Sequence, residues 1–504
     1  MEPRDVPAVR LACEVSLNGE ETRAPRRALV FIAALMGLRA IVAAHAPLAF
    51  DEAYYWRWSK ALAAGYLDHP PLIAYVIRMG TTIFGDTPLG VRAVPLVLLI
   101  GATWAVWRSG ALLLRSDSAG VTAALFFNLT LMSSTVGLAA TPDSPAMAAA
   151  AFFVFSLAKV AETERPIWWA AAGAAGGFAL LAKYTAPFLG AGALLWLCVS
   201  PRERRWLRSP WPYLGAALAL AMFAPVIVWN AAHTWISFAW QFARVVTHGF
   251  SPRYLGDFVA GQVGLATPFI FILGLVGVVG IVRTEAKRRL PVLLIVAMLA
   301  PATAYFLGHS THSRVQGNWP SFLYPVFCIA AAWPGQIGGL GAHVVRFSRA
   351  AAVPTAALVT LVAYLHTFWP LVALPGSKDP VARLLAVGYG PIVEEIDALR
   401  RQTGARGIVT TNYAQTGWLA FYAPSHPPVV QLTEPDRWHQ EPPPAPDLMA
   451  GPVLYVTESW RDLKEMVAAR YARITLLARI PRLRGDVVIE DYLVYRADGA
   501  RDPR

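Results

Sequence analysis

Long apolar runs recur between residues 28 and 373, and they constrain the fold more than any other feature of the sequence. The first covers residues 28–48, close to the roughly 20 residues that a helix needs to cross a hydrocarbon core. Only 15% of the residues are charged, whereas a soluble chain carries about 25%. The sequence therefore predicts an α-helical polytopic membrane protein with about eleven spans, thirteen at most.

Basic residues between the apolar runs predict the orientation of the chain. Arg23, Arg26 and Arg27 precede the first run, so the positive-inside rule makes residues 1–27 a cytoplasmic segment. The net charge of +12 follows from such short loops, which offer no basic face for nucleic acid. The predicted spans lie near residues 28–48, 89–107, 119–140, 145–161, 167–182, 185–200, 211–229, 263–282, 290–307, 321–337 and 350–373.

The alternation of spans places most of the conspicuous polar side chains on one face of the membrane. The cytoplasmic connections each hold Arg or Lys, as the charge rule requires. The acidic, histidine and remaining basic residues gather in the outer segments, and this predicts a functional site on the outer face. The outer segments are residues 49–88, 141–144, 183–184, 230–262 and 308–320.

Past residue 376 the long apolar runs give way to short alternating segments. Residues 379–402 and 460–471 show apolar positions at helical spacing, and five short stretches are typical of strands. Alternating helices and strands predict a small α/β domain over residues 376–504, which the parity of the spans places outside. The multi-span domain is then residues 28–375. The predicted strands are 407–411, 428–432, 452–457, 474–480 and 486–496.

The segment 50–71, FDEAYYWRWSKALAAGYLDHPP, follows the first span directly. Asp51 and Glu52 open it, aromatic residues fill it, and Asp68 and His69 stand before two prolines at its end. Carboxylates beside a hydrophobic segment are unfavourable without a task or a partner. Two acidic clusters around one amphipathic segment therefore favour a catalytic loop, and the alternative is an aromatic belt at the membrane interface.

Further motifs follow in order along the membrane part and the C-terminal domain. The full ordered set is DEAYYW, DHPP, GVRAVP, TPDSP, LLAKYTA, PVIVWNAAHTWISFAWQ, QGNWP, DPVARL and YAQTGWLAFY. This set resembles that of the GT-C membrane glycosyltransferases, which use polyprenyl-phosphate sugars. They include protein O-mannosyltransferases, lipid A aminoarabinose transferases and rhizobial lipopolysaccharide galacturonosyltransferases.

The resemblance implies an inverting transfer of a sugar from a polyprenyl-phosphate carrier to an envelope acceptor such as lipid A, lipopolysaccharide core, another glycan or a protein. The site would lie on the periplasmic side of a bacterial inner membrane. It implies Asp51 as the base, with Glu52 and Asp143 as further catalytic residues. The residues expected at the donor phosphate are His69, Arg92, Lys183, Arg244 and Arg314. Those expected at the acceptor or sugar are Asp68, Tyr54, Tyr55, His233, Gln262, Asn318 and Trp319.

Each of these side chains also has a simpler interpretation. Asp51 could cap a helix that begins near Ala53, and Asp68 and Asp143 stand beside prolines, where turns favour Asp. Lys183 could extend its amine to the membrane interface. In lipid A aminoarabinose transferases a lysine precedes the paired prolines, whereas here His69 does. Phosphate binding must therefore depend more on Lys183 or an arginine, or on protonated His69.

No cofactor is expected. His309 and His312, with His233 or His248, could begin a metal site, but nothing in the spacing fixes a third ligand. Three cysteines provide no disulfide framework. Two other functions stay open: a transporter or flippase for a glycolipid, which would place ionisable residues at mid-membrane, and a scaffold whose outer domain binds a partner.

Overall fold

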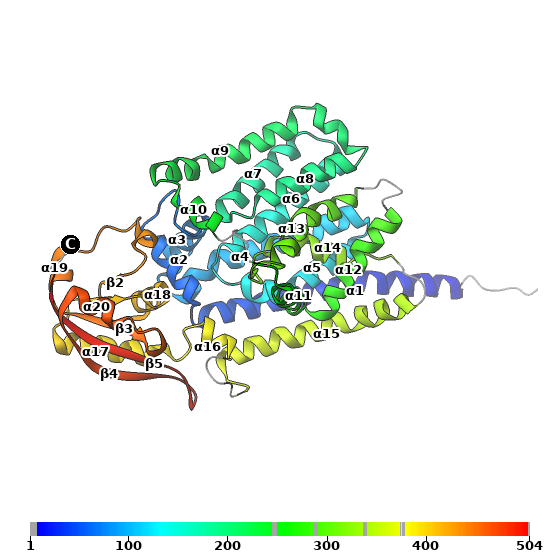
Figure 1. Ribbon diagram of the computed structural model, residues 1–504. Coiled ribbons are helices and arrows are strands. Elements are labelled where there is room, and N and C mark those ends of the chain that lie inside the picture. Colours follow the sequence, from blue (N-terminus) through cyan, green and yellow to red (C-terminus); the bar gives the residue numbers. More distant parts are fainter. Residues whose placement is uncertain are drawn as a thin grey trace, which may run out of the picture.

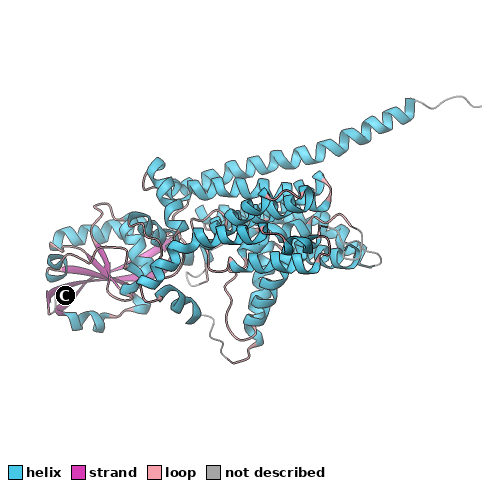
Figure 2. Ribbon diagram, turned by 90° about the horizontal axis from the view of Figure 1, so that it is seen from above, coloured by secondary structure: helices cyan, strands magenta, loops and turns pink. Residues whose placement is uncertain are grey.

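The computed structural model describes residues 8–243, 249–285, 291–335, 340–372, 374 and 378–501 (Figure 1). A bundle of helices forms one part, and a smaller domain with a β-sheet lies at one end of it (Figures 1 and 2). The helices up to residue 368 are α1 (Ala8–His45), α2 (Phe50–Lys60), α3 (Leu72–Phe84), α4 (Pro88–Leu114), α5 (Asp117–Leu129), η1 (Met132–Val136), α6 (Asp143–Thr163), α7 (Ile167–Ala182), α8 (Pro187–Val199), η2 (Glu203–Arg208), α9 (Trp211–Ala232), α10 (Ile236–Ala243), α11 (Pro252–Ala266), α12 (Pro268–Gly280), η3 (Ile281–Glu285), α13 (Leu293–Ser310), η5 (Ser321–Leu323), α14 (Tyr324–Ala331) and α15 (Leu340–Phe368).

Each of the eleven predicted spans contains a helix, but the helices differ in length. Within the described residues, six are long and apolar enough to cross a membrane, or seven if α11 and α12, bent by 103°, form one broken span. Helices such as α8 and α12 have only 13 residues, less than the roughly 20 of a full crossing. The protein is a multi-pass membrane protein, and the exact number of spans stays a prediction.

The first outer segment is helical and begins earlier than the sequence suggested. Its helix α2 starts at Phe50, with Ala49 at the N-cap position. The Glu52 carboxylate accepts a hydrogen bond from the Ala49 amide at 2.8 Å, as the acidic member of a capping box does. Asp51 therefore lies inside the first turn, and the interpretation that it caps a helix near Ala53 is wrong.

The C-terminal domain is built on a five-stranded mixed sheet of order β2-β1-β3-β5-β4. Strand β1 pairs in parallel with β2 and β3, and β5 pairs antiparallel with β3 and β4. All five predicted strands are present. The elements are α16 (Pro380–Leu384), α17 (Tyr389–Thr403), β1 (Ile408–Thr410), α18 (Tyr413–Tyr422), β2 (Val429–Gln431), η6 (Pro435–Trp438), α19 (Pro446–Ala450), β3 (Val453–Glu458), η7 (Ser459–Arg461), α20 (Lys464–Arg470), β4 (Tyr471–Arg484) and β5 (Val487–Ala500).

The single helix predicted over 379–402 is divided into α16 and α17. Gly388 separates them with φ +69°, a left-handed conformation that favours glycine. A Cβ atom at Gly388 would lie 1.9 Å from the Leu483 carbonyl oxygen, so the turn also needs the missing side chain. The break follows from contact with β4, which helical spacing does not reveal.

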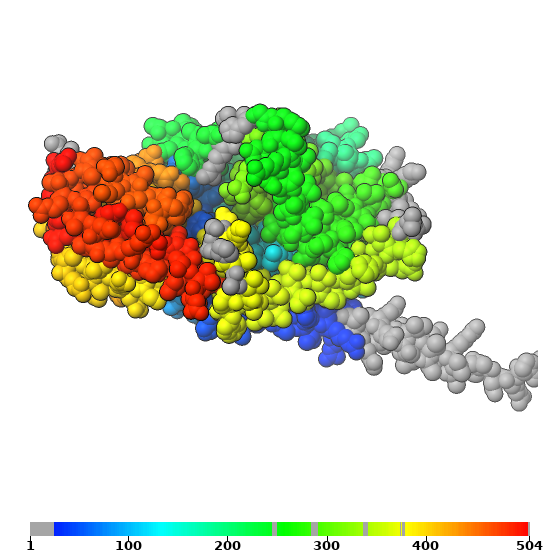
Figure 3. All heavy atoms as spheres, turned by 60° about the horizontal axis from the view of Figure 1, so that its bottom comes forward, coloured from blue at the N-terminus to red at the C-terminus, as the bar shows by residue number. Residues whose placement is uncertain are grey.

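The C-terminal domain packs directly against the end of the helical part (Figure 3). Its helix α18 lies against α2 of the first outer segment (Figure 1). The Trp418 indole donates to the Leu48 carbonyl at 3.2 Å, and the Leu48 amide donates to the Tyr422 hydroxyl at 2.8 Å. One hydrophobic cluster contains buried residues of α2, α3, α17, α18 and the sheet. The two parts of the chain therefore share a core.

Candidate active site

A cavity of about 880 Å³ lies where α2, α6, α8, α10, α13 and the C-terminal domain meet. Aromatic and aliphatic side chains line part of it: Leu180, Pro187, Phe188, Ala191, Phe223, Phe238, Phe242, Tyr305 and Phe306. Polar side chains line the rest, and nine of them are residues expected from the sequence: Asp51, Tyr54, Tyr55, Asp68, His69, Asp143, Lys183, Asn318 and Trp319. The cavity is therefore amphipathic.

Asp51 faces the cavity from the first turn of α2. The Tyr413 hydroxyl donates to its Oδ1 atom at 3.3 Å, and Asp51 makes no ion pair among the residues that the structure describes. Burial raises the pKa of Asp51 to about 7, and the negative charges of Asp68 and Asp143 add to the effect. The bond from Tyr413 and the charge of Arg437 oppose it. A carboxyl group with such a pKa exchanges protons near neutral pH.

Asp143 and Lys183 form a buried ion pair in the membrane part. The Lys183 amine donates to Asp143 Oδ1 at 2.5 Å, and the two side chains are 6% and 4% exposed. Ser321 donates to the same oxygen at 2.5 Å, and Asn318 donates to Oδ2 at 2.9 Å. The Lys183 amine also donates to the Asn318 carbonyl at 3.3 Å. This network joins α6, the α7–α8 connection and the QGNWP motif, which are far apart in the sequence.

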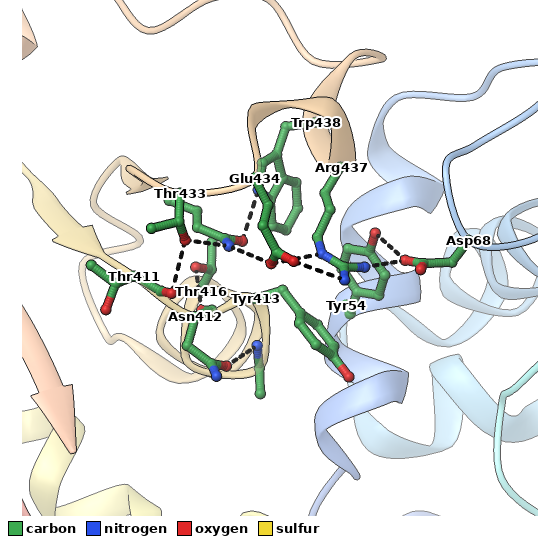
Figure 4. A network of polar contacts seen from close by, with 12 residues as sticks. Tyr54, Asp68, Thr411, Asn412, Tyr413, Thr416, Thr433, Glu434, Arg437 and Trp438 are labelled. Carbon is green, nitrogen blue, oxygen red and sulfur yellow. Dashed lines mark hydrogen bonds and ion pairs between the residues drawn. The ribbon is translucent and has the colours of Figure 1, made fainter. Parts of the chain in front are cut away.

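Asp68 forms a second ion pair, with Arg437 of η6 (Figure 4). The Tyr54 hydroxyl donates to Asp68 Oδ2 at 2.9 Å, and the Trp240 indole donates to Oδ1 at 3.0 Å. The Gln241 amide donates to the Asp68 carbonyl at 2.5 Å. Arg437 is only 6% exposed although it belongs to the C-terminal domain. His69 lies next to this group, with its ring centroid 6.1 Å from that of Tyr55.

Glu52 and Arg92 do not line the cavity, because they pair with each other inside the protein. Arg92 donates to the two Glu52 carboxylate oxygens at 2.7 and 2.5 Å, and Glu52 is fully buried. Arg92 also donates to the carbonyls of Ala46 and Pro47, and the Ala140 amide donates to Glu52. The pair fastens the end of α1, the start of α2 and the segment before Asp143. Its geometry is that of a structural clamp, away from the cavity.

Other expected residues also lie away from the cavity lining. Gln262 donates to the Gly317 carbonyl at 2.9 Å and accepts from Tyr324 at 3.0 Å, so it supports the loop that carries Asn318. His233 stacks on Trp229 at the end of α9 with ring centroids 4.0 Å apart, and Arg314 is exposed. Arg244 and His248 lie outside the described residues. Within the described part of the chain, no three His, Cys, Asp or Glu side chains form a group that could hold a metal ion.

Sequence reasoning missed several polar residues of the cavity, among them Tyr413, Arg437 and Gln241. Tyr413 and Arg437 come from the C-terminal domain, and Gln241 comes from α10. Tyr413 and Gln241 stand within motifs that carried the resemblance, so membership of those motifs was an available signal. Arg437 stands in a polar segment of the C-terminal domain, and nothing in the neighbouring sequence distinguishes it from a solvated arginine.

Comparison with known proteins shows which proteins this chain is similar to. Residues 68–229 match the family model described as dolichyl-phosphate-mannose-protein mannosyltransferase. The lipid A galacturonosyltransferase RgtD of Rhizobium johnstonii is 26% identical over 374 residues, which cover 72% of this chain and 75% of that protein.

The fold is also that of a solved membrane enzyme. The crystal structure of ArnT from Cupriavidus metallidurans bound to undecaprenyl phosphate superposes with a TM-score of 0.62 at 15% identity, covering 93% of this chain and 97% of that chain. The apo state of the same enzyme gives 0.60, with 94% and 98% coverage. The family match, the sequence relative and the shared fold together show a membrane glycosyltransferase that is similar to those of the GT-C class.

Proposed function

We propose that this glycosyltransferase transfers a sugar from a polyprenyl-phosphate carrier to an envelope acceptor, with lipid A as the first candidate. The observation that carries the proposal is one cavity that joins Asp51, a carboxylate with no ion pair among the described residues, to two ion-paired cations and many apolar side chains. The named relatives support the chemistry: one modifies lipid A and another was crystallised with undecaprenyl phosphate. The proposal places the cavity and the C-terminal domain on the periplasmic side of a bacterial inner membrane.

The donor phosphate is assigned to Lys183. An ammonium group has three N–H donors, and Asp143 and the Asn318 carbonyl accept from it within the described residues. The third donor and the positive charge can stabilise the departing phosphate. The apolar side chains, which include Phe188 and Phe306, line the same cavity and suit a prenyl chain or an acyl chain of the acceptor.

The reaction is a single displacement at the anomeric carbon. An acceptor hydroxyl attacks this carbon on the face opposite to the carrier, and Asp51 takes the hydroxyl proton as general base. The bond to the acceptor oxygen forms while the bond to the phosphate oxygen breaks, and the electron pair leaves with the carrier phosphate. The configuration at the anomeric carbon is thereby inverted. Lys183 offsets the developing negative charge, so the proposal assigns no metal cofactor, and transfer unaffected by EDTA would agree with this.

Positions of the polar groups disfavour a transporter. Two of the cavity aspartates, Asp51 and Asp68, are in direct contact with Tyr413 and Arg437 of the C-terminal domain. Glycolipid transporters with broken helices instead place such groups at mid-membrane.

The test compares envelope glycolipids by mass spectrometry in a strain that lacks the protein. The strain is complemented with wild type, with Asp51→Asn, or with Asp86→Asn as a matched control, because Asp86 pairs with Lys60 outside the cavity. We expect one sugar to disappear, to return with wild type and Asp86→Asn, and to stay absent with Asp51→Asn at equal protein level. General bases contribute about 10²- to 10⁴-fold. Full restoration by Asp51→Asn would refute the assigned base.

A further inference from the structure

We infer that Asp68 and Arg437 together form the subsite that recognises adjacent hydroxyl groups of the donor sugar, so that the C-terminal domain sets sugar specificity. This inference rests on the proposed function. It starts from the position of Arg437. The side chain of this residue extends from the C-terminal domain, lies between Glu434 and Asp68 (Figure 4) and lines the cavity. The guanidinium therefore joins a membrane-side carboxylate to the outer domain.

Charge argues that the ligand of this pair is a neutral hydroxyl group. Glu434 accepts from Arg437 Nε at 2.9 Å and from a terminal nitrogen at 3.3 Å, and Asp68 accepts from the other terminal nitrogen. Two carboxylates thus already surround one positive charge, and a third anion would meet net repulsion. Lys183 pairs with only one carboxylate. The carrier phosphate and a sugar carboxylate are accordingly better placed elsewhere in the cavity.

Hydrogen-bonding capacity fits two adjacent hydroxyl groups. Glu434 and Asp68 engage three guanidinium N–H groups, and arginine has five N–H donors in a fixed fork. Asp68 offers carboxylate oxygens that accept from hydroxyl groups. One sugar hydroxyl can therefore accept from Arg437 while its neighbour donates to Asp68. The affinity of such an ion pair for a sugar depends on the presence and the orientation of both hydroxyl groups.

The surroundings hold the guanidinium in one place. Its central carbon lies 4.7 Å from the ring centroid of Tyr413, 5.3 Å from that of Trp240 and 5.9 Å from that of Tyr54. Rings at these distances attract a cation and restrict its motion. Only a side chain fixed in this way can discriminate between sugars by the geometry of single hydroxyl groups.

A second layer of contacts fixes Glu434 itself. Gln431 donates to the Glu434 carboxylate at 3.2 Å, and the Trp438 indole donates to Gln431 at 3.0 Å. Glu434 also has φ +50°, a conformation that a non-glycine residue keeps only where its surroundings enforce it. The whole loop 431–438 is therefore built to present Arg437 to the cavity.

The experiment measures binding to the purified full-length protein in detergent. Three probes are used: undecaprenyl phosphate, undecaprenyl-phosphate galactose and undecaprenyl-phosphate galacturonate. The proteins are wild type, Arg437→Gln, Arg437→Lys and a matched control, Arg479→Gln, whose side chain is 63% exposed and pairs with Asp491. Wild type and the control should bind the sugar-bearing donors more tightly than the bare carrier. Arg437→Gln should lower the affinity for both donors equally, by roughly 10- to 100-fold, and leave that for the bare carrier unchanged.

Arg437→Lys keeps the positive charge but loses the forked set of N–H donors. This variant should therefore also lose the additional affinity that the sugar gives the donor. Unchanged carrier affinity shows that the variants are folded. The inference is overturned if Arg437→Gln still binds both sugars tightly, if only galacturonate binding falls, or if carrier affinity falls as well. It is also overturned if wild type binds the sugar-bearing donors no more tightly than the bare carrier. Failure of wild type to bind any of the three probes would instead refute the proposed function.

Discussion

Asp51 and Glu52 are neighbours in the sequence, yet they occupy opposite environments. Successive residues of an α-helix point about 100° apart, so α2 directs Asp51 to the cavity and Glu52 toward Arg92. Glu52 has a cationic partner in Arg92 and forms part of a clamp. Asp51 forms no ion pair among the described residues, and its pKa is raised mainly by burial, with the negative charges of Asp68 and Asp143 adding to the effect.

The pKa of Asp51 predicts how transfer depends on pH. A general base must be deprotonated before it can accept a proton, so the rate should fall below the pKa of about 7 and reach a plateau above it. The acidic limb of log kcat/KM should have a slope near one in a transfer assay between pH 5 and 9. Asp51→Asn should abolish this limb together with most of the activity. An unchanged limb in that variant would assign the titration to another group.

At the scale of elements, the contact between α2 and α18 brings Tyr413 to the site. The helices approach closely because Gly417 has no side chain at the crossing. A Cβ atom at Gly417 would lie 2.9 Å from the Tyr54 nitrogen and 3.0 Å from the Ala53 carbonyl carbon. These are backbone atoms of a helix that also carries Asp51, and they cannot move aside without moving the site.

Gly417→Ala should therefore separate α18 from α2 and displace Tyr413. We expect destabilisation of about 1–3 kcal/mol, the usual range for overpacking, and a loss of transfer larger than the change in stability explains. The matched control is Gly390→Ala in α17, where no atom lies within 4 Å of the added methyl group. Thermal unfolding in detergent and a transfer assay check both variants. Equal stability and equal transfer by the two variants would show that the close approach of α18 to α2 is not needed for activity.

At the scale of the whole molecule, the C-terminal domain is part of the active site and part of the core. It contributes Tyr413 and Arg437 to the cavity, and its α18 covers the aromatic face of α2. Arg57 of α2 also forms an ion pair with Glu441 and donates to the Val429 carbonyl at 2.9 Å. The arrangement disfavours a domain that only binds a partner beside an independent enzyme.

Deletion of residues 378–504 tests this view. The truncated protein should lose transfer and should expose the segment 49–88 to protease, because the buried aromatic residues of α2 lose their cover. Limited proteolysis of isolated membranes, with cleavage sites assigned by mass spectrometry, would detect the exposure against full-length protein at equal level. Wild-type transfer by the truncated chain would show instead that the domain is dispensable.

Local patterns in the sequence were sufficient for the elements. The eleven apolar runs each became helical, and the five β-rich stretches each became strands, because hydrophobic periodicity and β-propensity act over short distances. Position was predictable as well: the outer-segment residues Asp51, Asp68, Asp143 and Lys183 do lie around one cavity. Their roles in catalysis stay predictions.

The sequence alone determined a polytopic helical protein with a small C-terminal α/β domain, and it predicted that many of its polar residues would gather at one site. Only the tertiary structure decided which charges are paired. It joined Glu52 to Arg92, Asp143 to Lys183 and Asp68 to Arg437, the last across 369 positions of the chain. The physical reason is that a charge is stabilised by whatever lies within a few ångströms, and packing of distant segments sets those distances.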